Sequence, residues 1–255
     1  MTAVQGTAVD VPTEDGVADA YLAHPGDDRP HPAVLLCMDA FGLRPGLRAM
    51  ADRLAGHGYT VLVPNLFHRH GRAPVVELPE FIDAGSRGPV FEKLLPLIRE
   101  LTPRLAARDT GAYLRWLADC PQAADGPVGV VGYCMGARVA LVAAGHHPER
   151  VAAVAGFHGG HLATDAPDSP HRVADRVRAE VYFGHADHDP SMDAEQQRRL
   201  EEALTAAGVR HRCEVYEGAR HGYTQADTTE YDKEADERHW AALLDLLERT
   251  LPQGG

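Results

Sequence analysis

The chain has 255 residues, a length compatible with one α/β domain. Hydrophobic residues make up 44% of it and charged residues 24%, so the composition excludes an intrinsically disordered chain. The net charge of −12 argues against nucleic-acid binding through bulk charge, because phosphate contacts require clustered Lys and Arg. No apolar run approaches the ~20 residues of a membrane-spanning helix, so we expect neither a nucleic-acid nor a membrane partner.

The ends and the cysteines favour a cytoplasmic protein. Met1–Gln5 carries neither a basic start nor an apolar stretch, so we expect no secretory signal. The cysteines form no CxxC pair and no closely spaced set, which argues against a disulfide scaffold. They are Cys37, Cys120, Cys134 and Cys213.

The first predicted elements form an antiparallel hairpin. Strand-like segments at 7–11 and 17–24 flank the turn sequence Thr13–Gly16, which contains an Asp-Gly pair. The following run 33–38 is continuously apolar rather than alternating, which is typical of a strand buried on both faces of a parallel sheet. A helix at 47–57 and a second buried strand at 60–63 follow.

The middle of the chain is less regular. Residues 65–90 contain several Pro and Gly, and we expect this segment to be an insert that shapes the entrance of a pocket. From about 90 to 119 the pattern is helical, and Pro96 and Pro103 predict a break in it.

Alternating strands and helices return in the second half. The strands are predicted at 128–132, 151–156, 179–184 and 212–216, and the helices at 135–146, 194–207 and 230–251. An antiparallel start followed by repeated strand–helix units predicts a single α/β domain over 1–255. Its sheet is doubly wound and mostly parallel, with helices on both faces.

The sharpest local motif is Gly132-Tyr133-Cys134-Met135-Gly136, between a predicted strand and a predicted helix. This is the G-x-S-x-G nucleophile elbow with Cys in place of Ser. The strained turn leaves no room for side chains two residues before and after the nucleophile, which explains both glycines. The helix N-terminus favours a thiolate at Cys134. A small buried Cys in a tight turn is the alternative.

An acid and a His follow the elbow in the order that this arrangement requires. Asp187 comes after the strand 179–184, and His221 comes after the strand 212–216. The carboxyl ends of parallel strands meet at one edge of a sheet, so the side chains of Cys134, Asp187 and His221 are expected to converge there. Asp189 and Asp193 are nearby alternatives for the acid.

Five segments in this order resemble the signature segments of the dienelactone hydrolases (carboxymethylenebutenolidases). The resemblance extends from about residue 7 to 251 and is weakest over 68–110. The segments are Asp39-Ala40-Phe41-Gly42, Val63-Pro64-Asn65-Leu66, Gly132-Tyr133-Cys134-Met135-Gly136, Gly184-His185-Ala186-Asp187-His188 and Ala219-Arg220-His221-Gly222-Tyr223.

The resemblance implies an α/β-hydrolase fold and a Cys–His–Asp triad that cleaves lactones or esters. It also implies an oxyanion hole formed by the backbone N–H groups of Ala40 and Met135. The position of Ala40 after a buried strand agrees with this role.

Two positions depart from the family pattern. The family has a Glu that holds the resting thiol where this chain has Asp39, which is one methylene shorter. Asp39 is therefore expected either to hold the thiol or to cap the helix that starts near Leu43. Gln225 occupies the place of a family Arg that grips a substrate carboxylate. A second such Arg lies in the poorly matching stretch.

Several further residues are candidates for substrate contact. Three of them are arginines, and the alternative interpretation is that these are solvated surface charges. Phe41 and Tyr223 adjoin the proposed oxyanion and base positions, and His158 follows the strand 151–156. No metal-ligand spacing, P-loop or dinucleotide-binding motif is present, so we expect neither a metal nor a cofactor. The arginines are Arg69, Arg72 and Arg87.

The sequence therefore predicts a hydrolase of a small ester or lactone that proceeds through a thioester on Cys134, acting as a monomer or small homo-oligomer. A general carboxylesterase or thioesterase with the same triad is the first alternative. A non-catalytic hydrolase-fold protein that binds ligands or senses redox state through Cys134 is the second.

Overall fold

The computed structural model describes residues 3–251. The ends of the predicted domain, 1–2 and 252–255, lie outside the described residues. The same holds for the first two residues of Met1–Gln5, the segment from which we predict no secretory signal. Among residues 3–251, none of the helices is both long and apolar enough to cross a membrane.

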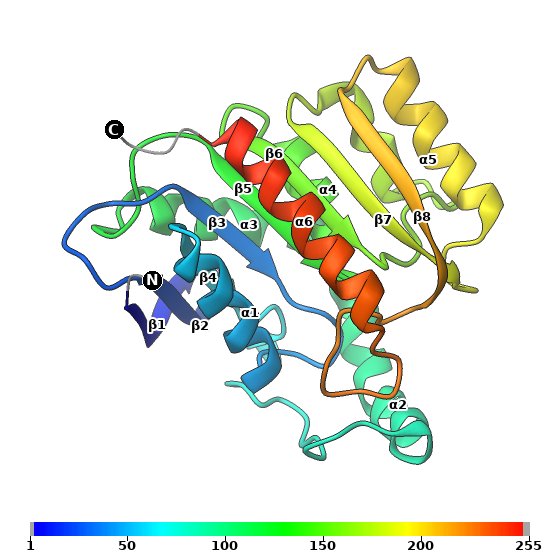
Figure 1. Cartoon of the computed structure of the whole chain (residues 1–255), viewed down its shortest axis with the longest axis horizontal. Coiled ribbons are helices and arrows are strands. Elements are labelled where there is room, and N and C mark those ends of the chain that lie inside the picture. Colours follow the sequence, from blue (N-terminus) through cyan, green and yellow to red (C-terminus); the bar gives the residue numbers. More distant parts are fainter. Residues whose placement is uncertain (1–2, 252–255) are drawn as a thin grey trace.

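Within this range, eight strands form one sheet in the order β1-β2-β4-β3-β5-β6-β7-β8 (Figure 1). The hairpin β1–β2 is antiparallel, β2 pairs antiparallel with β4, and the other neighbours are parallel. This confirms the predicted mostly parallel sheet with its N-terminal hairpin. The strands are β1 (Val4–Thr13), β2 (Gly16–Pro25), β3 (Ala33–Cys37), β4 (Thr60–Pro64), β5 (Val128–Tyr133), β6 (Val151–Phe157), β7 (Glu180–His188) and β8 (His211–Arg220).

Helices cover both faces of the sheet, as predicted. In Figure 1, α1 and α6 lie in front of it, and α3 and α4 lie behind it. Strands β3, β4 and β5 are buried along their whole length because they are covered on both sides, which explains their continuous apolar sequences. The helices are α1 (Pro45–Gly56), α3 (Pro103–Ala118), α4 (Met135–His146), α5 (Ala194–Ala206) and α6 (Lys233–Thr250), with short 3₁₀ segments η1 (His68–His70) and η2 (Pro170–Arg176).

The segment 65–102 contains a helix that begins earlier than the sequence predicts. Helix α2 (Ala84–Glu100) begins inside the expected insert because Asp83 and Ser86 form a capping box there. It runs through Pro89 and Pro96 without ending. The predicted break in the helical pattern is confirmed and lies just before Pro103, where α3 begins.

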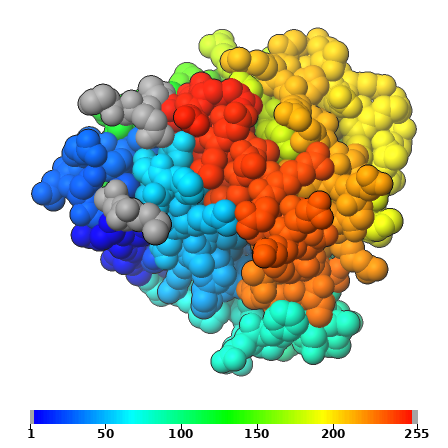
Figure 2. Space-filling model, viewed as in Figure 1, coloured from blue at the N-terminus to red at the C-terminus, as the bar shows by residue number. Residues whose placement is uncertain are grey.

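Helix α2 lies away from the sheet and next to the segment that precedes α6. Figure 2 shows it as a teal ridge along the lower edge of the molecule. An isolated bridge between Ile82 and Thr228 joins the two segments just before α2. The helix therefore lies at the sheet edge where the carboxyl ends of the parallel strands meet.

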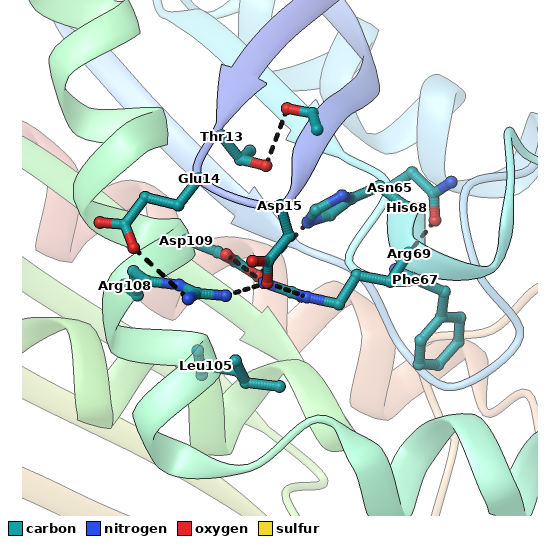
Figure 3. Close-up of polar contacts among 12 residues, drawn as sticks. Thr13, Glu14, Asp15, Asn65, Phe67, His68, Arg69, Leu105, Arg108 and Asp109 are labelled. Carbon is teal, nitrogen blue, oxygen red and sulfur yellow. Dashed lines mark hydrogen bonds and ion pairs between the residues drawn. The ribbon is translucent and has the colours of Figure 1, made fainter.

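An ion network around the buried carboxylate of Asp109 ties the N-terminal hairpin to α3 (Figure 3). The guanidinium of Arg69 donates two hydrogen bonds of 2.7 Å to Asp109 and one of 2.6 Å to Asp15, in the hairpin turn. Arg108 also pairs with Asp15. Burial raises the pKa of Asp109, but hydrogen bonds from His68 and Arg69 outweigh burial and lower it. The network is therefore structural.

We expect Asp109→Asn to lower the free energy of unfolding by about 2–3 kcal/mol, because it leaves Arg69 without its buried partner. The matched control is Asp10→Asn, which removes the partner of Arg72 in a pair whose side chains are 63% and 55% exposed. This control should change stability by less than about 0.5 kcal/mol. Urea unfolding of both variants measures the difference, and equal losses would contradict a structural role for the Asp109 network.

Candidate active site

The elbow motif adopts the strained turn that its sequence predicts. Cys134 lies between β5 and α4 with φ of 53° and ψ of −114°, in the region that non-glycine residues rarely adopt. A Cβ atom at Gly132 would lie 2.1 Å from the carbonyl oxygen of Gly136, and one at Gly136 would lie 2.2 Å from that of Cys37. Both glycines are therefore required by close backbone approach.

The imidazole of His221 lies between the Cys134 sulfur and a carboxylate. Its Nε2 is 3.0 Å from Cys134 Sγ, and its Nδ1 is 2.6 Å from Asp189 Oδ2. The other oxygen of Asp189 accepts hydrogen bonds from the backbone N–H and the hydroxyl of Ser191, at 2.9 and 2.6 Å. The carboxylate is thus fixed in orientation and fixes the ring in turn.

The prediction that Asp187 is the partner of His221 is wrong, and the alternative Asp189 takes the place. Strand β7 runs to His188 rather than Gly184, because its end pairs with Arg220 of β8. Asp187 is therefore still part of the strand. Its exposed carboxylate accepts a hydrogen bond from the backbone N–H of Gly218. Asp189 is the first residue past the strand.

The charges of the pair support a thiolate and an imidazolium. Burial raises the pKa of Cys134, but the charge and hydrogen bond of His221 outweigh burial and bring the pKa below its usual value. The backbone N–H of Met135 adds to this effect. Burial lowers the pKa of His221, yet the Cys134 charge and the Asp189 hydrogen bond raise it to about 10. Both shifts favour the ionised form of the pair.

Cys134, Asp189 and His221 line a cavity of about 280 Å³, here called the thiol cavity. Its other walls come from the loop after β3, from α2 and from the segment before α6. Its size suits a small substrate. The remaining lining residues are Ala40, Phe41, Arg87, Phe91, Pro190, Ser191 and Gln225.

Two predicted contact residues lie in this cavity. Phe41 forms part of the wall, and the Arg87 guanidinium carbon lies 5.8 Å from the centre of its ring. The buried Nη1 of Arg87 has no hydrogen-bond partner among the described residues. An arginine without a carboxylate partner beside the thiol is suited to bind an anionic group.

Asp39 does not hold the thiol. One of its oxygens accepts hydrogen bonds from Arg44 at 2.8 Å and from the backbone N–H of Phe41 at 2.9 Å, and the other accepts one from Gln225 at 2.8 Å. Arg44 also pairs with Asp227. These partners occupy both carboxylate oxygens, and the sulfur is hydrogen-bonded to His221 instead. The helix-cap alternative is wrong as well, since α1 begins after Arg44 without a side-chain cap. Asp39 instead anchors the loop after β3.

Four other predicted contact residues lie outside the thiol cavity. His158 is fully buried next to His221, with ring centres 5.3 Å apart, and its Nε2 is 2.8 Å from the hydroxyl of Thr224. The hydroxyl of Tyr223 donates to the carbonyl of Gly184. The ring of Tyr223 packs against that of His158, with centres 5.0 Å apart, so of the two only His158 contacts the His221 ring directly. Arg69 is held in the network of Figure 3, and Arg72 pairs with Asp10.

The sequence analysis did not single out Ser191 or Phe91. Ser191 lies two residues after Asp189, a spacing at which its backbone N–H can donate to the Asp carboxylate in a short turn. This spacing could have pointed to Ser191 once Asp189 was chosen as the acid. Phe91 lies one helical turn after Arg87 on α2, a helix that was predicted to begin later. Residues 3–251 contain no group of three His, Cys, Asp or Glu side chains suited to hold a metal.

Iodoacetamide should label Cys134 before the other three cysteines at pH 7, because its thiolate is stabilised. Burial raises the pKa of Cys37 and Cys213 to about 12 and also raises that of Cys120. As pH falls, the Cys134 rate should decline only below the usual thiol range. Mass spectrometry of peptides after timed quenching measures the order. Equal labelling of all four would contradict an activated thiol.

Comparisons with known proteins identify the family of the chain. The family model described as "Dienelactone hydrolase family" matches residues 18–251. A Rhodococcus opacus protein named carboxymethylenebutenolidase is 28% identical, over 92% of this chain and 87% of its own. A Synechocystis protein named "Putative carboxymethylenebutenolidase" is 26% identical, over 97% and 98%.

A Klebsiella pneumoniae crystal structure described as "Putative Dienelactone Hydrolase" superposes with a TM-score of 0.82, covering 96% of this chain and 98% of that one. Its sequence identity is 22%, so this likeness speaks for the fold. It confirms the predicted α/β-hydrolase architecture. With the family model covering most of the described residues, the chain belongs to the dienelactone hydrolase family and is a carboxylic ester hydrolase.

Proposed function

We propose that the chain hydrolyses small esters or lactones through a thioester on Cys134, with His221 and Asp189 as the other members of the triad. The observation that carries the proposal is the unbroken hydrogen-bonded row from Cys134 Sγ to His221 Nε2, at 3.0 Å, and from Nδ1 to Asp189 Oδ2, at 2.6 Å. A base within hydrogen-bond reach of the nucleophile and oriented by a third group is the arrangement that nucleophilic catalysis requires.

The first half of the reaction forms the thioester. The Cys134 thiolate attacks the carbonyl carbon, and the carbonyl electron pair moves to oxygen. When the tetrahedral intermediate collapses, the bond to the ester oxygen breaks and His221 gives its proton to the leaving alkoxide. In a lactone this oxygen remains attached to the acyl group. Asp189 keeps the ring aligned throughout.

The second half releases the acid. His221, now neutral, takes a proton from water, and the resulting hydroxide attacks the thioester carbonyl. The carbon–sulfur bond breaks, which restores the thiolate, and the imidazolium again faces it. The backbone N–H groups of Ala40 and Met135 serve as the oxyanion hole. Ala40 lines the thiol cavity, and the Met135 N–H already stabilises the thiolate.

A general carboxylesterase or thioesterase remains the runner-up, because Gln225 replaces the Arg that the family pattern would place there. Arg87 favours a substrate that carries a carboxylate, since its guanidinium lacks an ion-pair partner among the described residues. We place this activity in the cytoplasm, because the cysteines show no disulfide pattern.

The identity of the acid is tested by Asp189→Asn against the matched control Asp187→Asn. The first change should lower kcat/KM for p-nitrophenyl acetate by about a hundredfold or more, because the ring loses its orienting charge. The second should stay within about twofold, as expected at an exposed position. Steady-state kinetics on both variants measures the loss of kcat/KM. A larger loss for Asp187→Asn would identify Asp187 as the acid of the triad.

The role of Arg87 is tested with p-nitrophenyl hemisuccinate, which carries a carboxylate, and p-nitrophenyl butyrate, which has the same acyl length without one. Arg87→Met should raise KM for the hemisuccinate about tenfold and leave KM for the butyrate within about twofold. Arg72→Met is the control, since that side chain pairs with Asp10 outside the cavity. Equal effects on the two esters would remove Arg87 from carboxylate recognition.

A further inference from the structure

A second cavity lies beside the thiol cavity and has no role in the chemistry above. Its volume is about 430 Å³, and most of its wall is apolar. We call it the tail cavity. It lies between the α2–α3 junction, α4 and the loop that follows β6. Its lining includes Leu95, Ile98, Pro103, Val139 and Val142 together with the polar residues Arg99, Arg138, His161 and Asp168.

Helix α2 contributes one continuous face to both cavities. Arg87 and Phe91 line the thiol cavity, and Leu95, Ile98 and Arg99 line the tail cavity. Residues three and four positions apart lie on the same side of a helix. The side of α2 that begins at the thiol cavity therefore continues into the tail cavity.

The opposite walls continue in the same way. Cys134 caps the N-terminus of α4, and Arg138 lies one turn further along that helix, in the tail cavity. The loop wall passes from Ser191, in the thiol cavity, to His161, whose backbone N–H donates to the Ser191 carbonyl at 2.7 Å. Three elements thus run from one cavity to the other, so the tail cavity lies next to the site around the sulfur, although the two cavities share no lining residue.

Arg138 is the charged group in the wall nearest to Cys134. Its guanidinium makes no hydrogen bond or ion pair among residues 3–251, although it interacts electrostatically with the Cys134 sulfur and with the His161 ring. Burial lowers the pKa of Arg138 and also that of His161, so the imidazole is uncharged at neutral pH. Arg99 and the carboxylate of Asp168 are exposed, at the outer part of the wall.

A half-buried arginine without a hydrogen-bond or ion-pair partner among residues 3–251, in a mostly apolar cavity, is suited to pair with an anionic ligand. We propose that the tail cavity binds an apolar substrate segment that ends in a carboxylate, which pairs with Arg138 while the ester carbonyl lies at Cys134. Four helical residues span about 6 Å, which an acyl chain of roughly five to eight carbons covers. The inference rests on the proposed function and specifies its substrate class.

Hydrolysis of three p-nitrophenyl esters tests the proposal. The hemisuberate is long and anionic, the octanoate is equally long and neutral, and the hemisuccinate is short and anionic. Arg138→Met should lower kcat/KM for the hemisuberate at least about tenfold and leave the other two within about twofold. Arg138→Lys should restore part of the loss, and Arg178→Met, at an exposed position on another part of the surface, should match the wild type.

Two results would overturn the proposal: no change with Arg138→Met, or an equal loss on all three esters, which would make Arg138 an activator of the thiolate. If Arg138→Met does not fold, as judged by circular dichroism, Arg138→Gln replaces it.

A binding measurement separates this proposal from the function on which it rests. Monomethyl suberate is titrated into Cys134→Ala by calorimetry, with and without Arg138→Met. The second change should weaken binding about tenfold. If binding depends on Arg138 but the wild type does not hydrolyse the esters, the proposed ligand of the tail cavity is supported and the hydrolytic mechanism is rejected. Hydrolysis that needs Cys134, with binding indifferent to Arg138, would reject the tail cavity alone.

Discussion

The structure depends on the contact between the Cys134 sulfur and the His221 imidazole. A thiol and an imidazole from distant parts of the chain lie within hydrogen-bond distance, and their mutual attraction together with the carboxylate on the far side of the ring favours separation of charge. The strained backbone at Cys134 lifts the sulfur to the N-terminus of α4, and the sheet brings the ends of β7 and β8 to the same edge. Each of these features has a cost in strain or desolvation that only the assembled site offsets.

The buried strands and the nucleophile elbow could be predicted from the sequence, because interactions between residues close in the chain determine them. Continuous apolar runs marked the buried strands, and Gly132 and Gly136 marked the elbow, since backbone contacts exclude a side chain at either position. The choice between Asp187 and Asp189 was different. Where β7 ends depends on pairing with Arg220, and no local pattern reports that pairing. Strand length set by a partner strand is a long-range property.

Ion pairs were the second source of error. Arg69 and Asp39 each had a plausible role from their place in the chain, yet each is held by partners from other elements. The carboxylate of Asp109 lies forty residues from Arg69, and the amide of Gln225 lies far from Asp39. A sequence read locally shows which charges exist but not which of them are already neutralised. Arg87 was a candidate from the sequence, but the absence of an ion-pair partner for Arg87 and Arg138 among the described residues appears only in the folded chain, where both line cavities.

The residue that becomes acylated during turnover is the most direct evidence for or against Cys134 as the nucleophile. Rapid acid quench of the enzyme mixed with p-nitrophenyl acetate, followed by peptide mass spectrometry, traps the covalent intermediate. We expect an acetyl group on Cys134, absent when His221 is replaced by Ala. Acetylation of a different residue during turnover, or unchanged hydrolysis by Cys134→Ala, would contradict this role of Cys134.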